Sequence, residues 1–234
     1  MITILNIETS TEICSVSIAR DGKCIDIIID NPLENGESAH GQHSKILAIL
    51  IKDILENNNL KATDLDAIGI SEGPGSYTGL RIGVSTAKGV CLGSEIPLVA
   101  VNTLHIIAEM ASKTKKNEYD YIIPMIDARR MEVYCSVYDS KMKLIKETEA
   151  KIIDENSFED FAGKRILFCG NGAEKCKDIL DKPENDFDGK IFPSAEYMAE
   201  ISNNYFQKDE IVDLVYFEPF YLKSFIATTP KKKI

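Results

Sequence analysis

Apolar and polar positions along the first half of the chain follow two kinds of pattern. Short alternating runs predict strands, and longer runs with apolar residues every three or four positions predict helices. Asp21-Gly22 joins two of the strand-like runs and is typical of a β-hairpin turn. The predicted strands cover residues 2–8, 13–19, 23–30, 65–71 and 97–101, and the predicted helices cover 44–57, 80–92 and 104–112.

The second half of the chain repeats this order of elements. Strands are predicted at 121–127, 131–139, 143–153, 165–169 and 190–192, and helices at 157–162, 173–180 and 195–207. Because internal repetition constrains a whole fold, we expect an α/β protein of two similar lobes, each a mixed sheet with helices. A polar, lysine-rich stretch near 114–118 predicts an N-terminal lobe of residues 1–114 and a degenerate C-terminal lobe of residues 115–234. By analogy of element order, this is the duplicated plan of the actin-like (ASKHA, ribonuclease H-like) superfamily.

Composition and charge narrow the class of protein. The 234 residues, 44% of them hydrophobic, are enough to bury a sizeable core. The chain has no run of about 18 apolar residues and no basic-then-apolar leader, so a cytoplasmic protein without a membrane span is expected. The six cysteines are scattered and form no Cys-x-x-Cys pair, which favours buried reduced thiols over disulfides or zinc. A formal net charge of -10 disfavours direct binding of a nucleic-acid backbone.

The turn after the first predicted strand carries Glu8, Thr9 and Ser10. In actin-like proteins this turn meets nucleotide phosphates, so these residues are candidates for a vestigial phosphate-binding site. They also fit a turn whose hydroxyl groups bond only to the local backbone, and the sequence leaves both interpretations open. At the corresponding place in the second half stands Arg129, where phosphate-binding turns usually have a glycine. A standard ATP site is therefore not expected.

Residues 71–83 form the most distinctive stretch of the chain, which is rich in glycine and lies between a predicted strand and a predicted helix. It is not a Walker loop, because no lysine follows until Lys88. Gly79, Gly83 and Ala87 recur every four residues and leave one helix face with almost no side-chain bulk. Another backbone could approach closely there, so packing is favoured over ligand binding at this face.

The helix predicted around residues 45–57 is apolar over more than half its circumference, which a single covered face does not require. The excess apolar surface must meet other residues of this chain or a second protein, and we expect a partner that packs against this helix and the small-residue helix beside it. Two adjacent rows run along the helix, and one of them should face the sheet. The rows are Ile46, Leu50 and Ile54, and Leu47, Ile51 and Leu55. The predicted partner interface consists of Ile46, Leu47, Leu50, Ile51, Ile54, Gly79, Gly83 and Ala87.

The three histidines do not form a pattern typical of a metal site. His40 and His43 lie three positions apart in a polar loop and are predicted to be solvated. His105 falls on a predicted helix without a second histidine at helical spacing, which is more typical of a packed or solvated side chain than of a ligand. No metal site is predicted.

Four motifs carry a resemblance to a known family. They are Ile7-Glu8-Thr9-Ser10, Gly73-Pro74-Gly75-Ser76-Tyr77-Thr78-Gly79-Leu80-Arg81, Ala87-Lys88-Gly89 and Asp127-Ala128-Arg129-Arg130-Met131-Glu132-Val133-Tyr134. Through them the chain resembles the TsaB family over essentially its whole length, most strongly in the first lobe and at the start of the second. The resemblance implies an actin-like fold and a role as the non-catalytic subunit of the machinery that places threonylcarbamoyladenosine on tRNA.

The resemblance also implies partners. It implies a dimer with the related catalytic subunit TsaD and cooperation with the ATPase TsaE in modifying the adenosine beside the anticodon of tRNAs that read codons beginning with A. The tRNA would be contacted only through the complex, and a homodimer could form when the partner is absent. The catalytic relative binds metal through two histidines, and their positions correspond here to Thr103 and Ile107, which cannot replace an imidazole. No catalytic residue, metal or cofactor is therefore expected.

Two other classes of function stay open alongside the scaffold subunit. An independent actin-like ATPase would need an acidic residue and a glycine that coordinate the nucleotide in each lobe. In the second lobe Arg129 stands at the place of the glycine, which disfavours this class. A metallopeptidase-like enzyme would need metal ligands or a nucleophile with an oriented base, and neither set of residues is found. The sequence leaves open weak nucleotide binding at Gly170-Asn171-Gly172 and favours a solvated tail at Lys231-Lys232-Lys233.

Overall fold

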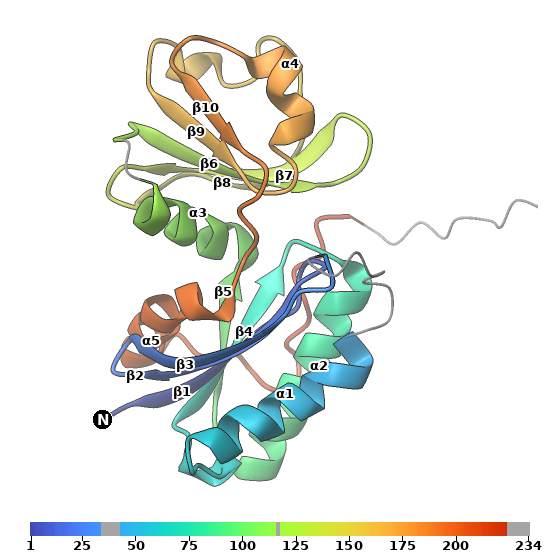
Figure 1. The fold of residues 1–234 in the computed structure, drawn as a ribbon, viewed down its shortest axis with the longest axis vertical. Helices are drawn as coiled ribbons and strands as arrows, with labels where there is room; N and C mark the ends of the chain where they lie inside the picture. The colour runs from blue at the N-terminus through green and yellow to red at the C-terminus, as the bar shows by residue number, and fades with distance from the viewer. Residues whose placement is uncertain (34–42, 116–117, 224–234) are drawn as a thin grey trace, which may run out of the picture.

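The computed structural model describes residues 1–33, 43–115 and 118–223, and these fold into two lobes, each built on a five-stranded sheet (Figure 1). His40 and the lysines at 231–233 lie outside the described residues. The strand order is β3-β2-β1-β4-β5 in the first sheet and β10-β9-β6-β7-β8 in the second. Read from opposite ends, the two orders are the same, so the predicted α/β fold of two duplicated actin-like lobes is confirmed.

The first lobe opens with an antiparallel meander and continues with parallel strands joined by helices. Asp21 and Gly22 have φ angles of 47° and 78° and form the predicted hairpin turn between β2 and β3. β4 pairs in parallel with β1, and β5 pairs in parallel with β4. The elements are β1 Thr3–Glu8, β2 Cys14–Arg20, β3 Lys23–Asp30, α1 His43–Asn57, η1 Ala62–Asp64, β4 Ala67–Gly73, α2 Tyr77–Ser94, β5 Leu98–Asn102 and α3 Thr103–Thr114.

The second lobe keeps the same plan with shorter helices. The helices predicted at 157–162 and 173–180 are largely reduced to 3-10 turns, with one turn of α-helix in α4. The elements are β6 Tyr121–Asp127, β7 Glu132–Asp139, β8 Leu144–Ile152, η2 Glu159–Phe161, β9 Ile166–Cys169, η3 Glu174–Cys176, α4 Lys177–Leu180, β10 Asn185–Asp188, η4 Ala195–Met198 and α5 Ala199–Gln207.

The strand predicted at 190–192 is wrong, because the last strand of the second sheet is β10 at Asn185–Asp188. This edge strand has the sequence Asn-Asp-Phe-Asp, which lacks an apolar run, and it is recognised only by its pairing with β9, where Phe187 lies opposite Phe168. Ile191 is buried between α3 and the second sheet without being part of a strand.

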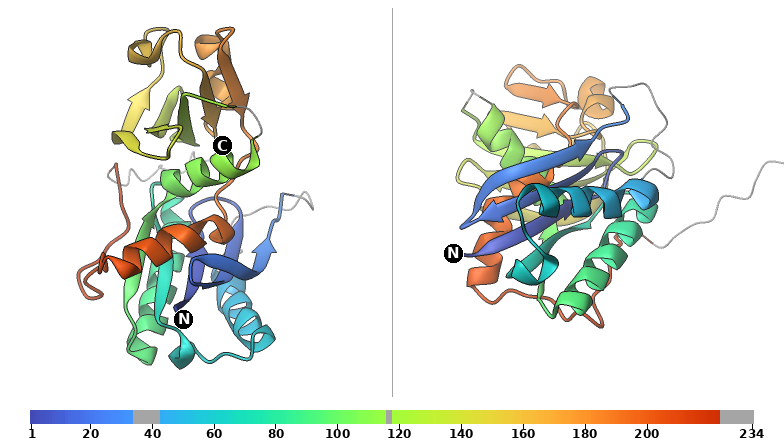
Figure 2. Two further views of the ribbon diagram at one scale, coloured as in Figure 1. Left: turned by 90° about the vertical axis from the view of Figure 1, so that its left-hand side faces the viewer. Right: turned by 60° about the horizontal axis from the view of Figure 1, so that its bottom comes forward.

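Helices cover both faces of the first sheet. On one face, Leu47, Ile51 and Ile54 of α1 and Val84 of α2 pack against the side chains of β1, β2 and β4. On the other face lie η4 and α5, with Met198 among the core residues. α3 packs against the second sheet, so α3 and α5 lie between the two sheets in Figure 2. The proposed division at 114/115 separates the sheets, while α5 crosses back to the first lobe.

The segment after α5, residues 211–223 and here called the C-terminal segment, returns along the first lobe. Val212 forms a bridge with Leu98 of β5, and the Phe220 amide donates to the Glu72 carbonyl at 2.8 Å. Lys88 Nζ on α2 donates to the backbone carbonyl of Val215 at 3.1 Å. No helix among the residues described is long and apolar enough to span a membrane.

Candidate functional site

The turn between β1 and β2 is covered by the start of α2. Thr9 and Ser10 are almost fully buried. Thr9 Oγ1 donates to the Gly79 carbonyl at 2.9 Å, and the amide of Ser76 donates to the Ser10 carbonyl at 2.7 Å. A Cβ atom at Gly75 would lie 2.3 Å from the Ser10 carbonyl oxygen. The glycines therefore let α2 sit directly on this turn, closer than any other residue would allow.

Glu8, at the end of β1, is buried in the same place. Its Oε1 accepts a hydrogen bond from the Ser10 amide at 2.5 Å. Burial raises the pKa of the Glu8 carboxyl from its ordinary value of 4.5 to about 7, although hydrogen bonds from Ser10 and Ser71 oppose the rise. Phosphate binding by Glu8, Thr9 and Ser10 stays a prediction, and it would require α2 to move away from the turn.

The corresponding turn of the second lobe, after β6, is held by a lysine of the same chain. Lys175 Nζ donates to the carbonyls of Arg130 at 2.8 Å and Glu132 at 2.7 Å, and it pairs with the carboxylate of Asp127. Arg129 has a φ of 70°, the left-handed conformation that favours glycine. The turn thus keeps the backbone shape of a glycine turn. The ammonium group of Lys175 and the residue Arg129 stand where a phosphate-binding turn would leave space for its ligand.

The loop that contains Gly170, Asn171 and Gly172 packs against the same turn. A Cβ atom at Gly170 would lie 2.4 Å from the Met125 carbonyl oxygen, so this loop also approaches backbone directly. Asn171 Oδ1 accepts from the Asp127 amide at 3.0 Å. The candidate residues for nucleotide binding in both lobes are therefore engaged with their own chain.

α2 carries small residues on two opposite faces. On the inner face, the predicted close approach of a backbone is confirmed: a Cβ atom at Gly79 would lie 2.1 Å from the Thr9 carbonyl oxygen, and one at Gly83 would lie 2.2 Å from Thr9 Oγ1. Ala87 is also fully buried. At Gly79 the approaching backbone is that of the β1–β2 turn of the same chain, and at Gly83 the approaching atom is the side-chain oxygen of Thr9, so this face of α2 packs inside the monomer.

The outer face of α2 is the one that stays open. Ser85, Gly89 and Gly93 repeat every four residues and are exposed. Beyond the Cβ positions of Gly89 and Gly93 there is no atom of the described structure within 4 Å. This second stripe was visible in the sequence as the same four-residue spacing, but only burial distinguishes the two faces. A helix from another molecule could approach α2 closely along it.

α1 also has an inner and an outer face, although its two predicted rows do not separate them. Leu47, Ile51 and Ile54 are at most 7% exposed, while Ile46 and Leu50 are partly buried and pack at the edge of the core. The row Leu47, Ile51 and Leu55 faces the sheet, as one row was expected to, but Ile54 of the other row joins this buried face, since a helix with 3.6 residues per turn follows a buried face by mixing steps of four and three. The outermost apolar side chain is Ile49, which is 56% exposed.

The two histidines that the structure describes, His43 and His105, lie on different helices, α1 and α3. His43 begins α1 and is only 7% exposed, so its predicted solvation is wrong. The ring of His105 stacks on Tyr138 at 5.3 Å, and burial lowers the pKa of His105. Thr103 and Ile107 are buried in α3. Within the described ranges, no three or more His, Cys, Asp or Glu side chains come together as a set that could hold a metal ion.

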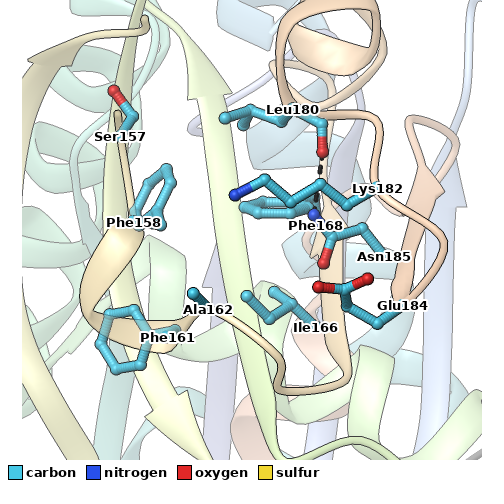
Figure 3. Close-up of a pocket in the computed structure, with 10 residues that line it drawn as sticks. All are labelled: Ser157, Phe158, Phe161, Ala162, Ile166, Phe168, Leu180, Lys182, Glu184 and Asn185. Atoms are coloured by element: carbon cyan, nitrogen blue, oxygen red, sulfur yellow. Dashed lines mark hydrogen bonds between the residues drawn. The ribbon is translucent and has the colours of Figure 1, made fainter. Parts of the chain in front are cut away.

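Two hollows in the second lobe offer little to a ligand. The cavity in Figure 3 has a volume of about 10 Å³, roughly the minimum for one water molecule, and lies among the rings of Phe158, Phe161 and Phe168. A surface groove of about 620 Å³ beside the end of α3 includes Lys115 and Arg165. Both cations are paired, with Asp188 and Asp186 respectively.

The duplicated sheets and their connecting helices define an actin-like, ribonuclease H-like α/β protein. The model of a family described as "TsaD: tRNA N6-adenosine threonylcarbamoyltransferase" matches residues 35–229. The chain belongs to the TsaB family, because it is 32% identical over 232 residues to the tRNA threonylcarbamoyladenosine biosynthesis protein TsaB of Escherichia coli (strain K12), covering 96% of each chain.

Other relatives agree with this placement. The protein named TsaB in Bacillus subtilis (strain 168) is 32% identical over 76% of this chain and 75% of its own length. The tRNA N6-adenosine threonylcarbamoyltransferase of Thermosipho africanus is 27% identical over 79% of this chain but only 58% of its own length. The solved structure of YeaZ from Pseudomonas aeruginosa is 25% identical and superimposes with a TM-score of 0.79 over 95% of this chain and 100% of its own.

Proposed function

We propose that this chain acts in tRNA threonylcarbamoyladenosine biosynthesis as a non-catalytic subunit. In the cytoplasm it would dimerise with a TsaD-like catalytic subunit and cooperate with a TsaE-like ATPase. Together they would transfer threonylcarbamoyl to the adenosine beside the anticodon of tRNAs that read codons beginning with A. Membership of the TsaB family, whose curated relatives are named as biosynthesis proteins for this nucleoside, supports the proposal.

The absence of catalysis by the isolated chain is the first part of the proposal. Thr103 and Ile107 occupy the helix positions that correspond to metal-binding histidines in the catalytic relative, and both side chains are buried in α3. Neither side chain has a nitrogen or carboxylate to offer a metal. We expect the purified chain alone to show no appreciable ATP turnover and no threonylcarbamoyl transfer, even with divalent metal present.

The open outer surface of α1 and α2 is the observation that carries the scaffold proposal. Ile49 is exposed there, Ile46 and Leu50 are partly exposed beside it, and Gly89 and Gly93 leave space for the backbone of a partner helix. Leu47, Ile51, Ile54, Gly79, Gly83 and Ala87 would hold the two helices in place from the inside. An apolar strip beside small residues is a surface against which a second pair of helices packs well.

Reconstitution tests this function directly. The chain, its cognate catalytic subunit and the ATPase would be purified separately, and threonylcarbamoyl incorporation into tRNA would be measured with each protein omitted in turn. We expect incorporation to fall to background when the chain is omitted. Equal incorporation by the other two proteins alone would contradict the proposal, and turnover by the isolated chain would contradict its non-catalytic assignment.

A homodimer in the absence of the catalytic subunit would be seen by sedimentation, as a species that the partner converts to a heterodimer.

A further inference from the structure

A strip of cations and aromatic rings joins the first lobe to the second. It begins on α2, where the guanidinium of the exposed Arg81 lies 5.4 Å from the centre of the Tyr77 ring. The ring of Tyr77 in turn lies 4.9 Å from that of Tyr221, which belongs to the C-terminal segment. Two residues further along, Lys223 reaches the second lobe, where its ammonium lies 5.8 Å from the centre of the Tyr134 ring.

The strip ends at Arg129 and Arg130, on the turn after β6. Both side chains are exposed, and neither guanidinium has an ion pair or a hydrogen-bond partner among the residues that the structure describes. The backbone of the turn is fixed, because the Arg129 amide donates to Asp127 Oδ1 at 2.7 Å and Lys175 Nζ donates to the Arg130 carbonyl at 2.8 Å. Two uncompensated guanidinium groups are thus presented to solvent from a rigid turn.

Acidic residues near the strip are largely neutralised. Glu132 pairs with Lys223, and Asp127 pairs with Lys175. The carboxylate of Glu218 also acts on Tyr221. The chain as a whole carries a formal net charge of -10, so a surface with uncompensated arginines is an exception to its general character. Such a surface attracts anions that the rest of the protein repels.

We propose that the basic strip, defined as Arg81, Arg129, Arg130 and Lys223, contacts the phosphate backbone of the tRNA that the catalytic subunit holds. This inference rests on the proposed function. Guanidinium groups bind phosphate oxygens through paired hydrogen bonds, and partly exposed tyrosine rings such as Tyr221 can stack on unpaired bases. Because the strip begins on α2, a polyanion bound by a protein docked on the outer face of that helix would reach it without crossing the acidic remainder of the chain.

An RNA backbone fits the basic strip better than an acidic protein segment does. The four cations are spread over two lobes and three separate chain segments, with rings between them, as suits an extended regularly charged strand. Contacts of this kind position the nucleic acid without reading its sequence. The strip would therefore increase the affinity of the assembled complex for all its tRNA substrates by the same factor.

The test compares two double variants in the reconstituted complex. Arg129→Gln/Arg130→Gln removes the two unpaired guanidinium groups, and Lys141→Gln/Lys143→Gln makes the same charge change at the turn beyond the opposite end of β7. Binding of unmodified tRNA would be measured over a series of salt concentrations. For the arginine variant we expect affinity to fall about tenfold at low salt, and the slope of log affinity against log salt to decrease by about 1 to 2. The lysine variant should have the same tRNA affinity and the same salt slope as the parent.

Sedimentation with the catalytic subunit, without tRNA, separates the possible failures. Parent and arginine variant should bind the subunit equally. If the parent does not bind, the proposed function fails and the strip has no tRNA to contact. If the arginine variant binds the subunit less well, the strip belongs to a protein interface and the RNA proposal is overturned. Unchanged tRNA affinity and salt slope, or an equal loss in the lysine control, would overturn it as well.

Discussion

The two faces of α2 carry the same kind of residue for two different purposes. At Gly79 and Gly83 a Cβ atom would collide with Thr9 of the same chain, whereas Gly89 and Gly93 face empty space. The inner glycines are explained by the fold of the monomer, because they let the helix sit on the β1–β2 turn. The outer glycines contribute nothing to that fold and lower helix propensity. Their presence is therefore better explained by something that packs on the helix from outside.

α1 offers the largest test of this distinction. Ile51→Glu would place an unpaired carboxylate in the core, at a cost of several kcal/mol, which approaches the roughly 5–15 kcal/mol stability of a typical domain. We expect this variant to be unfolded or to melt far below the parent. Ile49→Glu is the matched control, since this side chain is 56% exposed and its charge would stay hydrated. By circular dichroism, the melting temperature of the control should lie within a few degrees of that of the parent. If both variants lost the same amount of stability, the distinction between the inner and outer faces of α1 would be contradicted.

Glu8 tests how tightly the inner face is closed. Its folded-state pKa of about 7 lies above the ordinary value of 4.5, so the folded protein binds more protons than the unfolded chain between these values. The associated stability is fully present below pH 4.5 and is lost as pH rises through about 7. In Glu8→Gln this loss should vanish, so that the stability of the variant relative to the parent increases by about 3 kcal/mol from pH 4.5 to pH 8.

Urea unfolding of both proteins across that pH range measures the difference. A constant difference between Glu8→Gln and the parent would mean that the carboxyl is hydrated in the folded state. In that case α2 would not seal the β1–β2 turn, and the phosphate-binding hypothesis for Glu8, Thr9 and Ser10 would gain support instead.

Gly83→Ala should weaken the monomer by a smaller amount. The new Cβ atom would lie 2.2 Å from Thr9 Oγ1, so either the side chain of Thr9 or α2 must shift. Overpacking of this kind costs roughly 1–3 kcal/mol, partly offset by the higher helix propensity of alanine. The midpoint of urea unfolding should decrease. An increase would show that the turn adapts without cost.

Gly89→Ala should have the opposite and smallest effect. No described atom lies within 4 Å of the new methyl group, and glycine is less favourable than alanine inside a helix by about 0.8–1 kcal/mol. The midpoint temperature of thermal unfolding of the isolated chain should therefore rise by a few degrees. A clear decrease would mean that the monomer itself uses this face.

The sequence predicted the plan of the fold because the pattern that carries it is local. Alternating runs located the meanders of both lobes, and the Asp21-Gly22 turn was recognised from its residue types. β10 was missed because an edge strand that pairs on one side needs no apolar run. The C-terminal segment has no periodic pattern either, and its place depends on single contacts such as Lys88 with the Val215 carbonyl.

The candidate interface was predicted less completely. Spacing alone does not distinguish the two small-residue stripes of α2, and the stripe of Gly79, Gly83 and Ala87, which the sequence predicts as interface, faces inward. In α1 the excess of apolar residues indicated more than one covered face, yet Ile54 lies with Leu47 and Ile51 rather than with Leu50. Which face is buried depends on the position of the helix over the sheet, and a single helix sequence does not contain that information.

The scaffold proposal is tested most directly by comparing outer-face variants with the parent. The quantity measured is the affinity of each for the cognate catalytic subunit, by sedimentation velocity. Gly89→Leu fills the open space on α2, and Ile49→Glu places a charge on the exposed face of α1, while both should leave the monomer folded. We predict that each variant melts like the parent or higher and binds the catalytic subunit at least about 100-fold more weakly, since a charge or a steric block must be accommodated at a packed interface. Parent-like affinity in both variants would contradict the proposal that the outer face of α1 and α2 is the docking surface.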